Sequence, residues 1–295
     1  MDFVLDVFKT LLSSLLSGPY RLISFRGCLD TPVDKPDKII ILRHDVDRLP
    51  QNALKMARLE HGLGIRGTYY FRVVPESFDR RVIEAIAGMG HEIGYHYEDI
   101  DLVLRRWKAG GKKVGSEDAL IEAGMESFAE NLEKMREVYP IKTACMHGSP
   151  LSRYDNRLLW EKYDYRDYGI IGEPYFDIDF TDVAYYTDTG RCWNGERVSV
   201  RDKVADGAPE SPGATSGMVP EGWHPQYRST PAMIRAVEAG TFPAQAMLTV
   251  HPQRWHDAAL PWVKELCWQN VKNAGKRVLV RSRQAAKNPH RQELR

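Results

Sequence analysis

The chain has 295 residues, which is enough for one sizeable α/β domain with a buried core. Its 41 Lys and Arg residues nearly balance its 40 Asp and Glu residues, and the net charge of +1 argues against nucleic acid or an anionic surface recruited by overall charge. The four cysteines are scattered without a Cys-x-x-Cys pair, which argues against a zinc knuckle or a disulfide framework and favours reduced thiols in the cytoplasm.

Residues 1–30 are predicted to form an N-terminal amphipathic helix and a lead-in to the main domain. Helical spacing aligns a stripe of apolar side chains, namely Val4, Phe8, Leu11, Leu12 and Leu15. Because Asp6 and Lys9 interrupt the apolar stretch, we predict neither a signal peptide nor a membrane span. The stripe is expected to pack on the domain; peripheral membrane contact through residues 3–16, or a dimer contact, is the alternative.

Strand and helix signals then alternate through residues 31–280, the expected main domain. The predicted strands cover residues 38–43, 68–71, 91–96, 143–146, 169–171, 183–186 and 246–250. The predicted helices cover residues 50–60, 76–89, about 116–135 with Ser116 as cap, 230–239, and a last helix with Leu260, Val263, Leu266 and Cys267. Repeated βα units predict a parallel sheet or barrel, which collects reactive groups at its carboxyl edge.

Three segments are predicted to be irregular. Glu98 to Asp101 reads as an acidic loop after the third strand. Residues 201–225, rich in Gly, Pro, Ala and Ser, read as a long loop, either beside the active site or as an inert insertion. Residues 276–295 carry seven Lys or Arg, and 281–295 are expected to be a frayed basic tail.

Chemistry-bearing side chains follow several predicted strands. The segment Arg43-His44-Asp45-Val46-Asp47 comes directly after the apolar run Ile39 to Leu42. Histidines also stand at the ends of three later strands, at positions 96, 147 and 251. Four strand-end histidines among nine predict a shared metal or acid–base site.

The residue types suggest roles in a metal-assisted hydrolysis. Zn²⁺ takes carboxylate and imidazole ligands, which makes Asp47 and His96 the first ligand candidates. Asp45 is placed to accept a proton, and His251 to protonate a leaving group. The same ligands also suit Fe²⁺, Co²⁺, Mn²⁺ or Ni²⁺, so a divalent metal is expected with zinc preferred.

These residues carry a resemblance. Asp45-Val46-Asp47, Gly90-His91-Glu92-Ile93-Gly94-Tyr95-His96 and Leu248-Thr249-Val250-His251 resemble, in order and spacing, the motifs of polysaccharide deacetylases of the NodB homology domain, carbohydrate esterase family 4. The resemblance implies a distorted (β/α)7-type barrel. It also implies Asp45 as catalytic base, Asp47 and His96 as metal ligands, His251 as general acid, and metal-dependent removal of acetyl groups from sugars.

The sequence departs from the family pattern at two places. The family's second histidine ligand would stand at position 100, which is Ile100 here, so His147, Glu98 or Asp99 must complete the ligand set, or the metal site is weakened. His147 is the expected third ligand, because it is an imidazole at a strand end. The arginine- and proline-rich third motif is also absent, and Arg43 or His44 is expected to orient Asp45 and contact substrate instead. Asp188 and Trp193 are further candidates for lining the substrate pocket.

The leading hypothesis is a cytoplasmic metal-dependent amidase that acts on an N-acylated sugar. Its substrate would be a nucleotide-linked or lipid-linked intermediate of surface polysaccharide or lipopolysaccharide synthesis, with no nucleic-acid partner. One alternative is an inactive barrel that binds sugars or acts as a scaffold, which the missing histidine favours. The other is an amidase acting on a small non-sugar amide.

Overall fold

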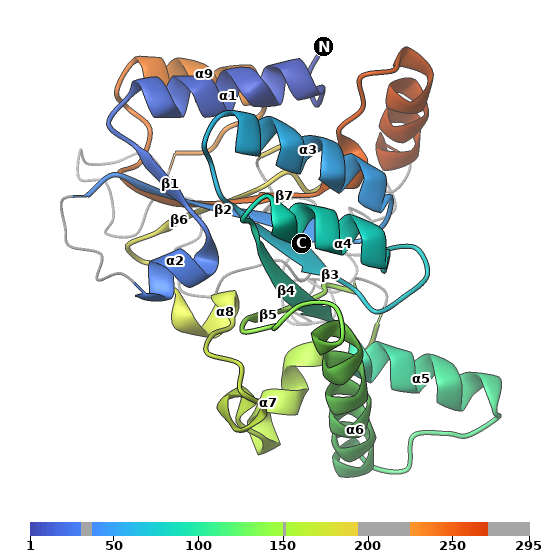
Figure 1. Cartoon of the computed structure of the whole chain (residues 1–295). Helices are drawn as coiled ribbons and strands as arrows, with labels where there is room; N and C mark the ends of the chain where they lie inside the picture. The colour runs from blue at the N-terminus through green and yellow to red at the C-terminus, as the bar shows by residue number, and fades with distance from the viewer. Residues whose placement is uncertain (31–36, 150–151, 194–224, 271–295) are drawn as a thin grey trace, which may run out of the picture.

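The computed structural model describes residues 1–30, 37–149, 152–193 and 225–270 (Figure 1). Its centre is a sheet of seven strands in which every pairing is parallel. The strands are β1 (Arg21–Ile23), β2 (Ile39–Val46), β3 (Thr68–Phe71), β4 (Glu92–Tyr97), β5 (Ala144–Met146), β6 (Ala184–Thr187) and β7 (Gln245–Val250). Their order is β5-β4-β3-β2-β7-β6, with β1 beside the first half of β2.

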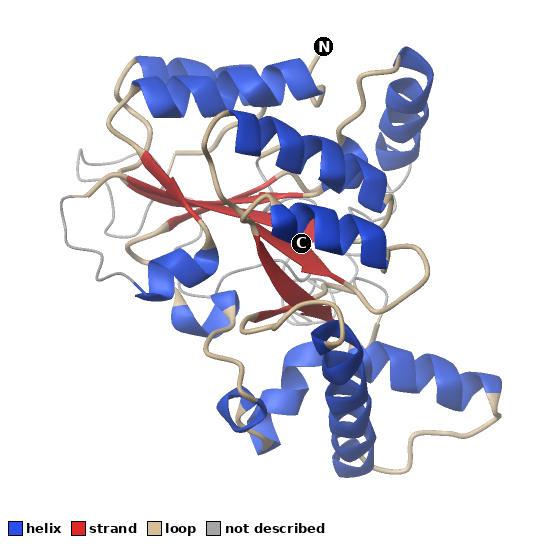
Figure 2. Ribbon diagram, in the orientation of Figure 1, coloured by secondary structure: helices blue, strands red, loops and turns tan. Residues whose placement is uncertain are grey.

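Helices connect the strands and cover the sheet (Figure 2). The α-helices are α1 (Leu5–Ser17), α2 (Phe25–Asp30), α3 (Pro50–Gly62), α4 (Arg80–Gly88), α5 (Asp99–Ala109), α6 (Glu117–Arg136), α7 (Leu159–Lys162), α8 (Pro174–Asp177) and α9 (Thr230–Glu238). Short 3₁₀ turns are η1 (Asn156–Leu158), η2 (Tyr165–Tyr168) and η4 (Pro252–Arg254), and residues 259–270 are helical. Within the described ranges, no helix is both long and apolar enough to cross a bilayer.

Alternation along the strands divides the buried side chains between two faces of the sheet. One face, which we call the outer face, packs against α1, α3, α4, α6 and α9 through two apolar clusters. The inner face is lined by Ile39, Ile41, Tyr70, Cys145 and Met247, and Phe25 of α2 packs on it. Arg43 and Asp45, which also stand at odd-numbered positions of β2, therefore face the inner side.

The sheet has the parallel α/β character expected. Beyond β5, a single bridge joins Thr143 to Gly172. Among the described residues no strand pairing joins this edge to β6; instead Tyr175 of α8 contacts Tyr185 of β6, with ring centroids 6.4 Å apart. The described sheet is therefore an open, curled half-barrel, with side chains filling the gap between the edge beyond β5 and β6.

Several predicted elements are confirmed with small shifts of boundary. The strands at the motifs all form, and Ser116 caps α6 by accepting a hydrogen bond from the Ala119 N–H at 3.1 Å. The helix predicted from residue 76 begins at Arg80, because the Asp79 side chain caps it by accepting from the N–H groups of Arg81 and Val82. The loop at 201–224 and the tail at 281–295 lie outside the described residues.

Two expectations about local structure are wrong. The acidic segment after β4 is not a loop: Asp99 and Asp101 form the first turn of α5, where negative side chains stabilise the helix dipole. The strand expected at 169–171 reduces to the bridge at Gly172, because Gly169 ends η2 in the left-handed region with φ 70°.

The N-terminal segment is integrated into the fold. The apolar stripe of α1 (Phe8, Leu11, Leu12 and Leu15) is fully buried, and α1 lies beside α9 (Figure 1). The segment after α1 adds β1 to the sheet and α2 to its inner face. The stripe is thus used for packing, as expected, and is not available to a membrane or a second copy.

Candidate metal and acid–base site

The Arg43 side chain holds Asp45 from the inner face of β2. Arg43 Nε donates to Asp45 Oδ1 at 2.8 Å and Nη2 donates to Oδ2 at 2.7 Å, a bidentate pair in which both side chains are buried. Burial alone would raise the pKa of Asp45, but the charge and hydrogen bonds of the Arg43 guanidinium outweigh it and lower the pKa below its usual range. Asp45 is therefore a fixed carboxylate at neutral pH.

Three side chains converge next to Asp45 at the carboxyl edge of the sheet. Asp47 follows the last residue of β2, His96 lies on β4, and His147 follows β5. Asp47 Oδ1 lies 3.5 Å from His96 Nε2 and 3.5 Å from His147 Nε2. Two ligands that each lie about 2.0–2.2 Å from a tetrahedral zinc ion are roughly 3.3–3.6 Å apart, so these separations suit a shared metal.

Hydrogen bonds to the other polar atoms of His96 and Asp47 leave the facing atoms of these two side chains free for a cation. His96 Nδ1 donates to the Cys145 carbonyl at 2.9 Å, which presents the Nε2 lone pair to Asp47. Gln253 Nε2 donates to Asp47 Oδ2 at 2.7 Å, while Asp47 Oδ1 is buried without a hydrogen-bond partner. A buried carboxylate oxygen without a donor is costly unless a cation compensates it, so the residues fit a metal ion.

Position 100 contributes nothing to this trio. Ile100 lies in the first turn of α5, where it is fully buried in the apolar cluster between α5 and α6. The second imidazole of the trio comes from His147 instead, directly after the neighbouring strand β5.

Glu98, one of the alternatives for the third ligand, lies behind His147. Its Oε2 is 3.5 Å from His147 Nδ1, and it accepts hydrogen bonds from Arg72 and from Arg105 Nη2, the latter at 2.7 Å. Burial opposes ionisation, but His147 and the two arginines lower the pKa of Glu98 to about 2. Glu98 is thus a permanent anion that can orient the His147 ring. Asp99, the other alternative, points into the α5–α6 contact, where it accepts from Ser127 and Asn131.

His251 is held by Asp188 on the opposite side of Asp45. His251 Nδ1 lies 2.6 Å from Asp188 Oδ1, and the His251 N–H donates to Asp188 Oδ2 at 3.0 Å. Arg254 Nη1 and Trp255 Nε1 also donate to Asp188, at 2.9 and 2.8 Å. With Nδ1 engaged by the carboxylate, Nε2 is the ring nitrogen that can exchange a proton with a substrate.

Three of the residues predicted from the sequence to contact substrate are instead enclosed by other side chains. His44 points to the outer face, where its Nε2 is 2.8 Å from Glu60 and its ring stacks on Tyr69. Trp193 is buried and donates from Nε1 to Thr230 at 3.0 Å. Asp188 stands behind His251 and is fully buried, so it contacts the imidazole and not open space.

Sequence reasoning missed Gln253 and Arg72. Arg72 Nη1 donates to the Asp47 carbonyl at 2.9 Å, and Gln253 fixes the Asp47 side chain. The signal for Gln253 was its place two residues after His251; Arg72, the first residue after β3, had the same strand-end position as the other candidates.

No model of a known protein family matches this chain, and no curated protein matches it. A solved structure of a mutant of a CE4 family pseudoenzyme, with restored enzymatic activity, is 12% identical; the match covers 82% of this chain and 64% of that one, with a TM-score of 0.40. The apo form of Escherichia coli diaminopropionate ammonia lyase is 13% identical, with 92% and 79% coverage and a TM-score of 0.21. Both similarities are too weak to indicate function.

Proposed function

We propose that this protein is a metal-dependent hydrolase that removes an acetyl or other acyl group from an N-acylated sugar. The observation that carries the proposal is the convergence of Asp47, His96 and His147 on one point, with Asp47 Oδ1 buried and lacking a hydrogen-bond donor. Asp45 and His251 flank this point, as the motifs that resemble NodB-type deacetylases imply. A sugar intermediate of surface polysaccharide synthesis is the proposed substrate class.

Asp47, His96 and His147 would hold the metal, with zinc preferred for a set of one carboxylate and two imidazoles. When bound, a divalent cation supplies Lewis-acid activation of water and of the acyl carbonyl. Arg43 keeps Asp45 ionised and fixed, so that its carboxylate can accept the proton of the attacking water. His251 Nε2 donates a proton to the sugar nitrogen as the carbon–nitrogen bond breaks, and Asp188 stabilises the ring's charge. The products are a free carboxylic acid and an amino sugar.

The position of His147 bears on the alternative of an inactive, sugar-binding barrel. That alternative drew its support from the absence of histidine at position 100. Since His147 brings a second imidazole nitrogen within 3.5 Å of Asp47, the ligand set does not need residue 100, and we favour hydrolysis.

The proposal is tested by metal content and by hydrolysis together. We expect the wild-type protein, purified without chelator, to bind about one equivalent of zinc, and Asp47→Asn and His147→Ala each to lose it, since each removes one of three protein ligands. His61→Ala is the matched control, because this histidine is on the exposed end of α3. Asp45→Asn should keep the metal and lose release of acetate from N-acetylated sugars.

Two results would contradict the proposal. Full metal retention in both Asp47→Asn and His147→Ala would mean that the site is misplaced. A metal-loaded wild-type protein that releases no acid from a panel of acylated sugars but cleaves cyclic or linear small amides would assign it to the other amidase class.

A further inference from the structure

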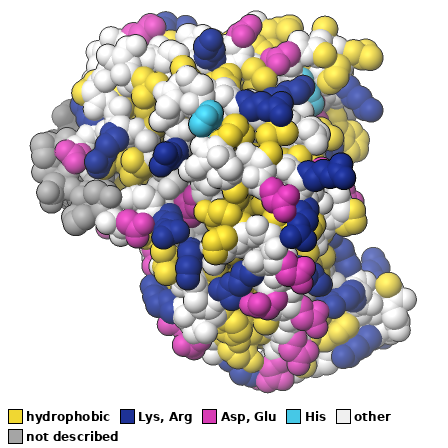
Figure 3. Space-filling model, in the orientation of Figure 1, with side chains coloured by type: hydrophobic (Ala, Val, Ile, Leu, Met, Phe, Trp, Pro, Cys, Tyr) yellow, Lys and Arg dark blue, Asp and Glu magenta, His cyan; other side chains and the backbone are white. Residues whose placement is uncertain are grey.

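The helix at residues 259–270 exposes several apolar side chains and buries two polar ones, which lie beside the half-buried Trp262 and Leu266. Glu265 and Gln269 are buried at 6% exposure each, joined by a 2.6 Å hydrogen bond, and Arg48 Nη2 donates to Glu265 at 2.9 Å. Leu260 and Val263, in contrast, are 82% and 48% exposed. A surface helix normally turns its apolar side chains inward, so the exposure of Leu260 and Val263 is unusual. Figure 1 shows this helix at the upper right edge of the molecule, and Figure 3 shows hydrophobic side chains there.

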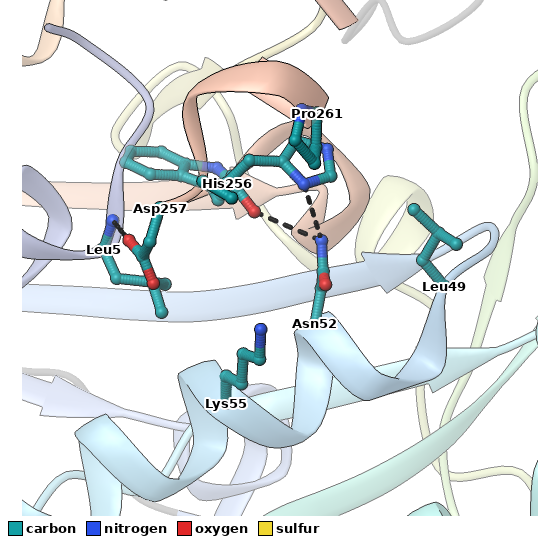
Figure 4. A pocket seen from close by; sticks show the side chains of 9 residues that line it. Leu5, Leu49, Asn52, Lys55, His256, Asp257 and Pro261 are labelled. Carbon is teal, nitrogen blue, oxygen red and sulfur yellow. Dashed lines mark hydrogen bonds between the residues drawn. The ribbon is translucent and has the colours of Figure 1, made fainter. Parts of the chain in front are cut away.

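A hollow of about 300 Å³ lies at the foot of this helix, between α3 and the start of α1. Figure 4 shows Leu49 and Pro261 among its lining residues, with Lys55 nearby. Leu49 is 46% exposed, so the apolar surface continues from the helix onto the loop before α3. We call Leu49, Leu260, Pro261 and Val263, with Lys55, the docking face.

Charge is distributed unevenly about the docking face. The sequence from position 271 to the last residue contains eight Lys or Arg and one Glu, a net charge of +7. The sequence up to position 270 contains 33 basic and 39 acidic side chains, a net charge of −6. The balanced total therefore hides a cationic stretch of sequence that comes directly after residue 270.

We propose that the docking face binds an anionic membrane surface, with the helix at 259–270 lying in the interface and the net charge of the sequence from position 271 onward adding electrostatic attraction. Apolar side chains on one side of a helix and nearby cations are the two contributions that bind a protein reversibly to such a surface. A second copy of this chain would fit less well, because the +7 segments of two copies would repel each other. This proposal does not depend on the chemistry of the site.

The docking face lies beside the site. Arg48, which binds Glu265 of the helix, directly follows the metal-ligand candidate Asp47. A membrane held at the docking face would therefore lie near the same edge of the sheet as the three converging ligands. Such an arrangement would suit an acylated sugar that is carried on a lipid.

Flotation with lipid vesicles tests the proposal on the full chain. We expect the protein to float with vesicles in which phosphatidylcholine is mixed with the anionic lipid phosphatidylglycerol, and much less with vesicles of phosphatidylcholine alone. The double variant Leu260→Glu/Val263→Glu should lose binding by about tenfold or more, because both carboxylates would oppose insertion and the anionic headgroups. Leu16→Glu is the control: Leu16 is 41% exposed on α1, away from the docking face.

Circular dichroism of each variant shows whether it remains folded, and the oligomeric state is measured by light scattering in parallel. Vesicle binding by Leu260→Glu/Val263→Glu that stays within twofold of wild type would overturn the proposal. So would a wild-type dimer that this double variant dissociates, since it would assign the face to a second copy. Because the readout is lipid binding, failure here would leave the proposed hydrolysis untouched.

Discussion

Asp188 accepts four hydrogen bonds, and all four donors belong to the segment from His251 to Trp255. An asparagine there would direct an amide nitrogen toward at least one of these donors and would stop fixing the His251 tautomer. We expect Asp188→Asn to lower the turnover number by about 10²–10⁴-fold, the range that a positioned general acid contributes. Turnover is measured across pH 5–9 with the metal content determined in the same samples.

The metal content of Asp188→Asn should equal that of the wild-type protein, because Asp188 contacts none of the three converging ligands. Conservative replacement by glutamate should recover part of the rate if orientation is the role. An unchanged pH profile and turnover in Asp188→Asn would remove Asp188 and His251 from the acid step.

At the residue scale, the sequence predicted which side chains stand at strand ends but not always where they point. Asp47, His96 and His147 could be chosen because parallel strands bring their carboxyl ends to one edge. Alternation within β2 separates His44 from Asp45, so only Arg43 of the two candidates reaches Asp45. The role of Asp188 depends on contacts across 63 residues of sequence, which no local pattern encodes.

At the element scale, the placement of α5 decides what position 100 can do. Ile100 is fully buried, and α6 approaches so closely that a Cβ on Gly124 would lie 2.7 Å from Ile100 Cδ1. We expect Ile100→His to reduce the free energy of unfolding by roughly 2–4 kcal/mol, because it buries an imidazole in an apolar contact. Ile100→Val, as a control, should cost only about 1 kcal/mol. Urea denaturation measures both.

Ile100→His also tests whether a histidine at position 100 can replace His147 as a metal ligand. In a His147→Ala background, Ile100→His should not restore metal binding, because residue 100 points into the α5–α6 contact. Recovery of one equivalent of zinc in the double variant would mean that α5 is positioned differently and that position 100 can reach the site.

Elements with strong local signals were predictable, and those defined by tertiary contacts were not. The apolar run Ile39–Leu42 and the proline at the first turn of α3 indicate their elements directly. β1 has only three residues, and its strand state depends on pairing with β2. The start of α5 was misread because Glu98, Asp99 and Asp101 resemble a polar loop, although acidic residues also favour a helix N-terminus.

At the scale of the whole molecule, two buried carboxyls make stability depend on pH. Burial raises the pKa of Glu173 to about 7 and that of Asp99 to about 6. Both groups bind a proton more tightly in the folded than in the unfolded chain, so their contribution favours folding at low pH and is lost as pH rises through 6–7. We therefore compare the free energy of unfolding of Glu173→Gln with that of the wild type. The difference in favour of the variant should be larger at pH 8 than at pH 5, by roughly 1–3 kcal/mol.

Chemical denaturation at pH 5 and pH 8 gives the four free energies that this comparison needs. Glu161→Gln, which changes an exposed glutamate, serves as the control and should show the same difference from wild type at both pH values. If Glu173→Gln also shows equal differences at the two pH values, Glu173 is ionised at pH 5 and its burial has no consequence for stability.

The pairing of β2 with β7 has a consequence for how the protein is made. Residues 39–44 of β2 pair with residues 245–250 of β7. One edge of β2 therefore stays unpaired until a segment about 200 residues later has been synthesised. At roughly 5–20 residues per second, the nascent chain leaves that apolar edge uncovered for about 10–40 s. The three converging ligands all emerge from the ribosome before β7, while His251 and Gln253 come after it. A chaperone that shields β2 would therefore act on a chain that can already meet metal but cannot yet complete its acid–base pair.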